Sequence, residues 1–569
     1  MNSTANLSSL IWSAADDVLR GLFKPSEYGR VILPFVVMRR LDCVLEPKKD
    51  EIFELYEKYK SQLDPTPIIQ KQVGLPFYNH SRYDLSGIKS DQNNVLMNFI
   101  NYVPGYSPNV LEIIENFSLT PLVEKLHKNK RLYLLIDKFT EFDLHPNAID
   151  NHAMGSVYEE LLRRFSEMSN EESGDHFTPR DIVKLLVTFV FGGDKEGLQG
   201  QGKIRSVFDP CCGTGGMLTI GKEWVLENIN KDLKIELYGQ ELNDVTYSIC
   251  KSDVLMSGEN PENIHGPCSS LSDDRLQGKK FDYMITNPPF GVSWKSEEEF
   301  ISEEAKDPNG RFFLGTPRTS DGSLLFLQHL ISKMNPEGSR IGIVFNGSPL
   351  FTGDAGSGES EIRKWIIEND WLETIIQMPD KMFFNTGITT YIWILTNKKS
   401  VERKGKVQLI DASSFFTGMR KNLGDKGNYF SDEQIEKLFE IYQSNLENEY
   451  CRIYPSNYFG YTKIVVEQPM IQDGNVVKDR QGNIKPDPSK RDTERVALSE
   501  SIEKYFETEV KSAVPDSWMD RSKDKVGYEI NFTKYFYKFR PLRSLDEISN
   551  DLMMLDNEIK KMSLELTSE

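Results

Sequence analysis

The ten residues FDYMITNPPF, at positions 281–290, decide the fold of the chain around them. The first six are largely apolar and aromatic, which predicts a short buried strand. The strand ends in the motif NPPF, formed by Asn287, Pro288, Pro289 and Phe290, whose two prolines fix φ and stiffen the chain. The side-chain oxygen of Asn287 and the carbonyl of Pro288 can accept hydrogen bonds from one amino group, and Phe290 offers a flat apolar face. The segment therefore fits a site for a planar, amino-bearing ring, although an ordinary strand-to-loop turn has the same pattern.

A glycine-rich turn follows the strand predicted at residues 204–208. The turn has the sequence DPCCGTGG and includes Asp209, Pro210, Gly213, Thr214, Gly215 and Gly216. A helix is predicted directly after it, and small residues between a strand and a helix let the backbone and the helix N-terminus approach a ligand closely. The next predicted strand, 234–239, leads to Glu241, whose carboxylate is placed to bind a ribose diol. The turn and the acidic residue together indicate an adenosine-binding site.

Strands and helices alternate through the middle of the chain. Further strands are predicted at 340–345, 374–378 and 390–396, with helices at 322–334 and 360–368 between them. Such alternation predicts an α/β fold around a mostly parallel sheet. Because ligands of these sheets bind beyond the carboxyl ends of the strands, the glycine-rich turn, Glu241 and NPPF are expected to share one crevice. This convergence favours a catalytic site at NPPF over a simple turn.

The motif GDHFTPR, residues 174–180, precedes a predicted amphipathic helix at 181–191. Thr178 is a suitable N-cap for this helix, and Pro179 suits its first position. A helix N-terminus beside an aromatic side chain can hold the carboxylate of a ligand, but the motif can equally be only a good helix start. The glycine-rich run at 197–203 is interpreted as a turn, because Ile204 stands where a phosphate-binding loop needs Ser or Thr.

The length of 569 residues is too great for one hydrophobic core and predicts two or three domains. We assign residues 1–145 to a helical domain, 146–468 to the catalytic domain and 469–569 to a C-terminal extension. Six cysteines without a CxxC pair indicate a reducing compartment, the cytoplasm, and predict no metal site. The longest apolar stretch, 182–191, is too short to span a membrane.

The formal net charge of −18 bears on the choice of partner. A protein that grips DNA alone usually has a strongly basic surface, since phosphate neutralisation supplies much of the affinity. Either this chain binds no nucleic acid, or its basic surface is local and a partner supplies most of the grip. Residues 523–543 are rich in Lys, Arg, Tyr and Phe and form one candidate surface, although their aromatic side chains can instead pack on the catalytic domain.

Taken together, the motifs resemble those of N6-adenine DNA methyltransferases that use S-adenosylmethionine, and more narrowly the HsdM-type modification subunit of type I restriction-modification systems. GDHFTPR, DPCCGTGG, GQELND (239–244) and NPPF carry the resemblance to the enzyme class, and residues 362–395 and 526–542 point to the subunit type. The resemblance implies a Rossmann-like methyltransferase sheet flanked by an N-terminal helical domain and a C-terminal helical tail. One departure is HGPCSSLSDD (265–274), where the family often has a GD or GN motif at the cofactor's adenine; Asp273 is a candidate for that contact.

The resemblance also implies a role for each motif. The cofactor-binding residues would be Asp175, His176, Phe177, Thr178, Pro179 and Arg180 at the methionine part, Asp209, Pro210, Gly213, Thr214, Gly215 and Gly216 in the cradle, and Glu241 at the ribose. The catalytic residues would be Asn287, Pro288, Pro289 and Phe290.

The implied activity is that of a site-specific adenine DNA methyltransferase. It transfers a methyl group from S-adenosylmethionine to the exocyclic N6 amine of adenine in a specific DNA sequence, which protects host DNA. Hydrogen bonds from that amine to Asn287 and Pro288 favour a tetrahedral nitrogen, so positioning supplies most of the catalysis. The adenine must be flipped out of the duplex and would stack on Phe290. The pair Phe383-Phe384 either lines the other side of the base or packs in the core.

The partners implied are double-stranded DNA, a DNA specificity subunit, a second copy of the modification subunit and a restriction subunit. Because no large insertion separates the glycine-rich turn from NPPF, a separate subunit is expected to read the DNA sequence. Ser544 and Glu547 form a capping box that predicts a last helix. Its narrow apolar stripe suits docking on the specificity subunit or folding back on the N-terminal helices. The stripe comprises Leu545, Ile548, Leu552, Leu555, Ile559, Met562 and Leu566.

Several alternative functions stay open on the sequence. They are a stand-alone DNA adenine methyltransferase, a methyltransferase of RNA or of protein glutamine, and a catalytically silent scaffold in a DNA-binding complex. Enzymes that act on RNA or protein more often have Tyr where this chain has Phe290. A damaged cofactor turn or NPPF motif would favour a scaffold, and both motifs are intact.

Overall fold

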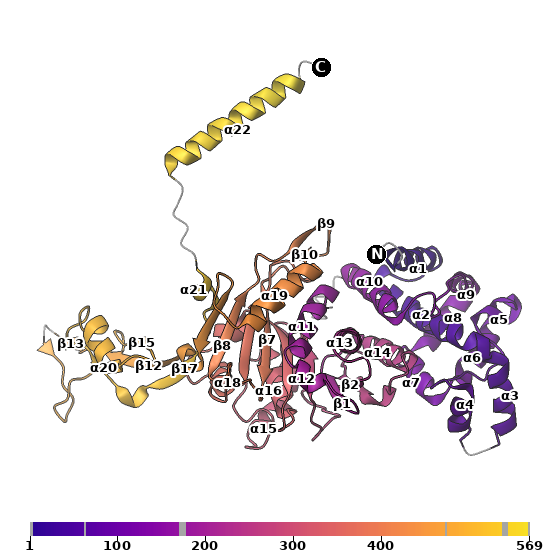
Figure 1. The fold of residues 1–569 in the computed structure, drawn as a ribbon, viewed down its shortest axis with the longest axis horizontal. Helices are drawn as coiled ribbons and strands as arrows, with labels where there is room; N and C mark the ends of the chain where they lie inside the picture. The colour runs from indigo at the N-terminus through magenta and orange to yellow at the C-terminus, as the bar shows by residue number, and fades with distance from the viewer. Residues whose placement is uncertain (1–3, 62–63, 170–177, 473–474, 538–543, 567–569) are drawn as a thin grey trace. The chain divides into compact units, whose positions relative to one another are not determined.

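The structure, a computed structural model, describes residues 4–61, 64–169, 178–472, 475–537 and 544–566 (Figure 1). By the density of its contacts the chain divides into two compact units, Met1–Ile530 and Asn531–Glu569. Among the described residues, no helix combines the length and apolar character that crossing a bilayer requires.

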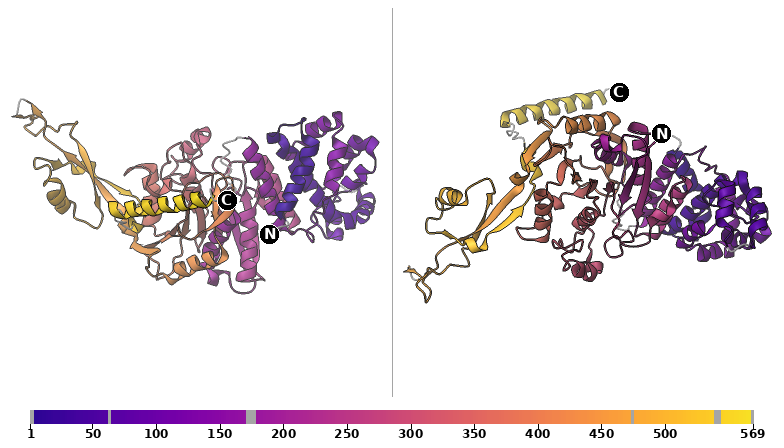
Figure 2. Two further views of the ribbon diagram at one scale, coloured as in Figure 1. Left: turned by 90° about the horizontal axis from the view of Figure 1, so that it is seen from above. Right: turned by 60° about the horizontal axis from the view of Figure 1, so that its bottom comes forward.

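The N-terminal part of the first unit is helical, as the sequence predicts. Its helices gather in one bundle, indigo to purple in both views of Figure 2. They are α1 Thr4–Leu19, α2 Tyr28–Leu45, α3 Lys49–Tyr59, α4 Thr66–Val73, α5 Leu85–Lys89, α6 Val95–Tyr102, α7 Pro108–Asn116, α8 Leu119–Lys128, α9 Leu132–Thr140 and α10 Asn151–Ser169.

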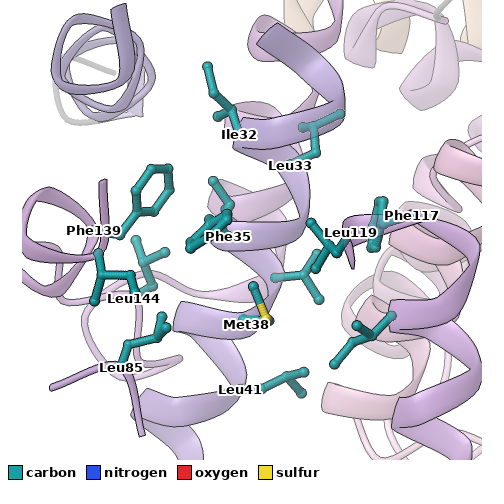
Figure 3. Packing of buried hydrophobic residues seen from close by; sticks show 14 of the residues in the cluster. Ile32, Leu33, Phe35, Met38, Leu41, Leu85, Phe117, Leu119, Phe139 and Leu144 are labelled. Carbon is teal, nitrogen blue, oxygen red and sulfur yellow. The ribbon is translucent and has the colours of Figure 1, made fainter. Parts of the chain in front are cut away.

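Helix α2 is the centre of this bundle. Nearly all of its residues are buried, which is the pattern of a helix surrounded by others on every side. Figure 3 shows Phe35 and Met38 of α2 among apolar side chains from other segments, such as Phe139 and Leu119. The buried Arg40 donates hydrogen bonds to the carbonyls of Leu144 (2.9 Å) and Ile149 (3.0 Å), so α2 also holds the segment that leads into α10.

The catalytic part is built on a nine-stranded sheet of order β11-β8-β6-β7-β5-β4-β1-β2-β3. Its strands are β1 Ile204–Asp209, β2 Lys234–Gln240, β3 Ile264–His265, β4 Tyr283–Thr286, β5 Arg340–Asn346, β6 Leu372–Gln377, β7 Thr390–Thr396, β8 Lys406–Asp411 and β11 Cys451–Pro455. Strands β3, β2, β1, β4 and β5 are parallel, whereas β7 is antiparallel to its neighbours β5 and β6. The chain runs outward from β1 to β3 and returns to β4 on the other side of β1, so the switch point of the topology lies between β1 and β4.

Helices cover both faces of this sheet. They are α11 Arg180–Gly192, α12 Lys195–Leu198, α13 Gly216–Asn228, α14 Asp244–Met256, α15 Glu298–Glu304, α16 Ser323–Ser332, α17 Ser348–Phe351, α18 Gly358–Glu368 and α19 Asp432–Ser444. Val207 of β1 belongs to the core that α11 and α13 share with the sheet, while the next residue, Phe208, contacts the ring of His329 on α16. Because successive side chains of a strand point to opposite faces, α16 lies on the face opposite to α11 and α13.

The predicted α/β fold is confirmed, and all six predicted strands are present in the sheet. The predicted cap of α11 is wrong in one detail. Pro179 itself is the N-cap, with extended backbone angles (φ −58°, ψ 143°), and the helix begins at Arg180. Thr178 therefore lies outside the helix and its hydroxyl is used elsewhere, as described below.

A second, smaller sheet ends the first unit. Its strands are β12 Gly460–Glu467, β15 Asp492–Ala497, β16 Trp518–Met519 and β17 Lys525–Tyr528, and β12 pairs with each of the other three. The short hairpin β13 Ile471–Gln472 and β14 Asn475–Val476 lies between β12 and β15 in the chain. Strands β12 and β15 lie on either side of residue 468 in the chain and pair with each other. The domain boundary that we assigned at 468/469 stays a prediction.

The second unit consists of α21 Phe532–Phe536 and α22 Leu545–Leu566. The capping box of α22 is present, because Ser544 N donates to Glu547 Oε2 (3.0 Å) and Glu547 N donates to Ser544 Oγ (3.2 Å). Five residues of the predicted stripe are exposed: Leu545, Ile548, Leu552, Leu555 and Ile559. The side chains of Met562 and Leu566 lie outside the described residues.

A buried ion pair ties the parallel and antiparallel parts of the large sheet together. Arg340 of β5 donates to Glu373 of β6 (Nη2 to Oε1, 2.9 Å), across the intervening β7, and Tyr442 of α19 donates to the same carboxylate (2.5 Å). Burial favours the neutral form of Glu373, but Arg340 outweighs it and holds the pKa of Glu373 below its usual value.

Replacing Glu373 with Gln leaves the Arg340 charge buried without its counter-ion. We expect a loss of about 3 kcal/mol in the free energy of unfolding, measured by urea titration. The matched control is Glu361→Gln, which breaks the half-exposed pair with Lys364 and should cost no more than about 1 kcal/mol. Equal losses in the two variants would contradict the role of the buried pair.

Candidate active site

A cavity of about 230 Å³ opens beyond the carboxyl ends of β1, β2 and β4, beside the switch point. Residues of the three predicted motifs line it together, among them Gly213 after β1, Glu241 after β2 and Asn287 after β4. This is the place where open α/β sheets bind their ligands.

The glycine-rich turn borders the cavity through its backbone. Gly213 has a φ of +54°, and a Cβ on it would meet no atom within 4 Å, so this turn faces open space. Gly215 has a φ of +85°, and a Cβ there would lie 2.8 Å from the sulfur of Cys250. Helix α13 begins at Gly216, and its N-terminus is therefore at the cavity wall. Only glycine satisfies both the left-handed conformation and the close packing at 215.

Two backbone donors hold the carboxylate of Glu241 in place. Gly213 N donates to Oε2 and Asn243 N donates to Oε1, each at 2.8 Å. The carboxylate is thus fixed before any ligand arrives. Glu241 thus connects the glycine-rich turn with the end of β2.

Asp209 is the buried first residue of the turn. Its Oδ1 accepts hydrogen bonds from Thr286 Oγ1 (2.7 Å) and Cys211 N (2.9 Å). Burial raises the pKa of Asp209 to about 7, although both hydrogen bonds act in the opposite direction. Its main structural contacts are thus with the ends of β1 and β4, and both Asp209 and Pro210 also line the cavity.

The side chain of Asn287 is oriented by Thr178. The Asn287 amide nitrogen donates to Thr178 Oγ1 at 2.9 Å, which places the amide oxygen on the opposite side of the group. Both residues line the cavity, as does Pro289, and Pro288 is buried beside them. The hydroxyl predicted to cap α11 therefore serves the NPPF motif.

Phe290 lies against Phe383 rather than in open space. The two rings meet edge to face with centroids 5.7 Å apart, and Phe290 is 9% exposed. Phe383 is fully buried, whereas Phe384 is partly exposed. Stacking of a base on Phe290 stays a prediction.

The remaining residues of the GDHFTPR motif are placed only in part. Arg180 Nε donates to Glu159 Oε2 of α10 at 3.3 Å, and Glu159 lines the cavity. Arg180 thus contacts a residue of the cavity wall but does not itself line the cavity. Asp175, His176 and Phe177 lie outside the described residues.

Sequence reasoning placed segment 265–274 near the cofactor's adenine through the family resemblance, but it did not name the residues of one cavity wall. This wall is formed by Cys268, Ser269, Ser270, Leu271, Trp294 and Glu297. Ser272 donates to Glu297 Oε1 (2.5 Å), and Arg311 fixes the same loop through the carbonyls of Ser270 (2.8 Å) and Leu271 (2.6 Å). The candidate Asp273 instead pairs with Arg275 and is half exposed. The signal for this loop was the family resemblance at 265–274, because β3 before it has only two residues and shows no pattern.

The charge of the cavity lining limits what it can bind. Among the described residues that line it, four are acidic (Glu159, Asp209, Glu241 and Glu297) and none is Lys, Arg or His. Glu159 is paired with Arg180, and burial raises the pKa of Asp209 to about 7, so these two contribute less negative charge than Glu241 and Glu297. Such a wall disfavours a polyphosphate and suits a ligand with cationic groups. S-adenosylmethionine, which combines an adenosine with a sulfonium and an ammonium group, fits this lining.

Comparison with known proteins places the chain in a family. Residues 149–477 match the family model described as N-6 DNA Methylase, and residues 7–139 match the HsdM N-terminal domain. The "Type I restriction enzyme MjaIX methylase subunit" of Methanocaldococcus jannaschii is 25% identical over 511 residues, 83% of each chain. The HindI methylase subunit of Haemophilus influenzae is 31% identical over 260 residues, 46% of this chain and 54% of that one.

A solved structure shares the fold. The type I restriction-modification system methyltransferase subunit from Streptococcus thermophilus superposes with a TM-score of 0.64 at 23% identity, covering 80% of this chain and 97% of that one. The family model spans more than half of the 569 residues and covers every motif that lines the cavity. The chain therefore belongs to the N-6 DNA methylase family and carries an HsdM N-terminal domain.

Proposed function

We propose that the protein transfers a methyl group from S-adenosylmethionine to the N6 amine of adenine in a specific DNA sequence, as the modification subunit of a type I restriction-modification complex. The observation that carries this proposal is the meeting of NPPF, the glycine-rich turn and Glu241 in one acidic cavity at the switch point of the sheet. The relatives named above are methylase subunits of type I restriction enzymes. Since host DNA is the substrate, the cytoplasm is the place of action.

The cofactor would be held by residues of three strand ends. When bound, S-adenosylmethionine supplies an electrophilic methyl group on sulfur. Glu241, already fixed by two backbone donors, would accept hydrogen bonds from the ribose hydroxyls. The glycine-rich turn would lie against the cofactor through its backbone, and Thr178, Pro179 and Arg180 would border its methionine end.

Asn287 and Pro288 would bind the target amine. The Asn287 amide oxygen and the Pro288 carbonyl would accept hydrogen bonds from its two N–H groups, which favours a tetrahedral nitrogen with a directed lone pair. Thr178 fixes the amide by accepting its N–H, so little reorganisation is needed at the moment of reaction. Positioning of this kind accounts for the rate without a dedicated general base.

The DNA sequence would be read by a separate specificity subunit. The capped helix α22 presents an exposed apolar stripe, which is suited to pairing with a helix of another chain. We propose the specificity subunit as that chain, with a second modification subunit, double-stranded DNA and a restriction subunit as further partners. Transfer of labelled methyl groups to DNA, with and without proteins co-purified from the native host, tests the whole assignment. Label on RNA or protein and not on DNA would overturn it.

Replacing Glu241 with Ala should weaken binding of S-adenosylmethionine by about 1–3 kcal/mol in calorimetry, the scale of lost hydrogen bonds to a charged group. The matched control is Glu236→Ala on β2, the strand that leads to Glu241; the Glu236 side chain pairs with Lys234 and does not line the cavity. Its affinity should equal that of the wild type. An unchanged affinity in the Glu241 variant would remove this residue from the site.

Replacing Asn287 with Ala should abolish methyl transfer to adenine while cofactor affinity stays within a few fold, because the amide contacts the amine and not the cofactor. Thr178→Val removes the acceptor that orients the amide and should lower the rate partially, with Thr178→Ser as the conservative control. Near wild-type transfer by the Asn287 variant would disprove the proposed role of NPPF.

Truncation after Arg543 removes α22 and should abolish co-purification with the specificity subunit while cofactor binding is retained. A finer test places two charges on the stripe, Leu552→Asp/Leu555→Asp, against a control with the same charge on the polar face, Asn550→Asp/Asn557→Asp. Only the stripe variant should lose the partner. A truncated chain that still assembles fully would refute docking through α22.

A further inference from the structure

The β-hairpin β9 Thr417–Leu423 and β10 Lys426–Tyr429 stands at the same edge of the sheet as the active site. It follows β8, which is parallel to β6, and both run in the direction of β5, because β7 is antiparallel to β5 and to β6. The carboxyl end of β8 therefore lies at the edge where β1, β2 and β4 end. The hairpin lies outside the residues that line the cofactor cavity.

The inner half of the hairpin, residues 425–428, is held against the start of α11. Lys426 is buried, and its ammonium group contacts both carboxylate oxygens of Asp181 at 3.1 Å. Phe430 N donates to the same carboxylate at 3.0 Å. Asp181 follows the GDHFTPR motif directly, so the hairpin is fixed beside the segment that carries Thr178.

The inner half is also tied to the loop that supports NPPF. Gly427 N and Asn428 N both donate to the carbonyl of Lys381 (3.0 and 3.2 Å), and Asp425 N donates to that of Phe384 (2.8 Å). Lys381 has a φ of +57°, which an L-residue adopts only where its surroundings impose it. Between these two anchors lies Phe383, whose ring packs on Phe290. The hairpin thus has a fixed position relative to the catalytic motif.

The outer half of the hairpin is the group Phe416, Arg420, Lys421 and Tyr429, whose side chains take no part in these anchoring contacts. Arg420 and Lys421 are exposed, and within the described part of the chain their side chains make no hydrogen bond or ion pair. They lie where the register of the two strands shifts, between the pairs Gly418–Asn428 and Leu423–Lys426. At the base of the hairpin, Phe416 is 43% and Tyr429 is 38% exposed. Two exposed cations and two partly exposed aromatic rings thus lie together on this hairpin, within a chain of net charge −18.

We propose that the outer half of the β9–β10 hairpin binds the sugar-phosphate backbone of duplex DNA beside the nucleotide that enters the NPPF site. The inference rests on the proposed function and adds a surface through which this chain itself grips its substrate. A two-stranded ribbon is narrow enough to follow a groove of DNA. Arg420 and Lys421 contact phosphates, whose counter-ions are released on binding, and Phe416 and Tyr429 lie against the sugars. The anchors at Asp181 and Lys381 hold this surface at a fixed position relative to the catalytic motif.

The test is the double variant Arg420→Ala/Lys421→Ala, purified in the complex that the chain forms with its co-purifying subunits. Affinity for a labelled duplex is measured over a series of salt concentrations. We expect the slope of log affinity against log salt to fall by about 2, because two phosphate contacts are lost. Methyl transfer should show a raised KM for DNA with kcat nearly unchanged at saturating DNA. Affinity for S-adenosylmethionine should equal that of the wild type.

The matched control is Lys231→Ala/Lys404→Ala, which removes the same charge from exposed positions shortly before the amino ends of β2 and β8, at the opposite edge of the sheet. It should keep the wild-type slope. The proposal is overturned when both double variants bind DNA like the wild type. It is also overturned when both lose affinity equally, since the loss then reflects only the change in net charge. A wild-type complex that neither binds nor methylates DNA would instead refute the proposed function. Measuring the wild-type complex therefore distinguishes a failure of the proposed function from a failure of the hairpin proposal.

Discussion

The hydrogen bond from Thr286 Oγ1 to Asp209 Oδ1, 2.7 Å long, joins the last residues of β4 and β1. Both residues are buried, and their strands are neighbours although 77 positions separate them in the chain. The bond fixes the points from which the glycine-rich turn and the NPPF motif leave the sheet. Because the switch point lies between these two strands, the cavity depends on this pairing more than on any single lining residue.

A second set of contacts crosses between α11 and the catalytic edge. Thr178 orients the Asn287 amide, and three residues later Asp181 holds Lys426 of the hairpin. The short stretch that begins α11 therefore positions both the group proposed to bind the amine and the surface proposed to bind DNA. A change in this stretch is expected to affect both, since the two are held by residues only three positions apart in the chain.

The distribution of charge separates two tasks within one edge of the protein. The cavity wall carries carboxylates and suits a cationic cofactor, whereas Arg420 and Lys421 are exposed on the hairpin at the same edge of the sheet. Exposed charges more than about 10 Å apart are largely screened from one another by salt. A strongly negative net charge is thus compatible with DNA as substrate, provided that the basic surface is local and a partner supplies further contacts.

The sequence by itself determined the features that depend only on residues close together in the chain. Short apolar runs, buried on both faces of the sheet, set the positions of the strands. Small residues marked the turn after β1, and Ser544 with Glu547 set the start of α22. Thr178 shows the limit, because its neighbours suggest a helix cap but its hydroxyl partner, Asn287, is 109 positions away. The wall from Cys268 to Leu271 follows a strand of two residues, held by pairing with β2, and Arg311 fixes it from a distant loop. Only the tertiary structure decided these contacts, since they depend on which strands lie side by side, and that depends on the packing of the whole sheet.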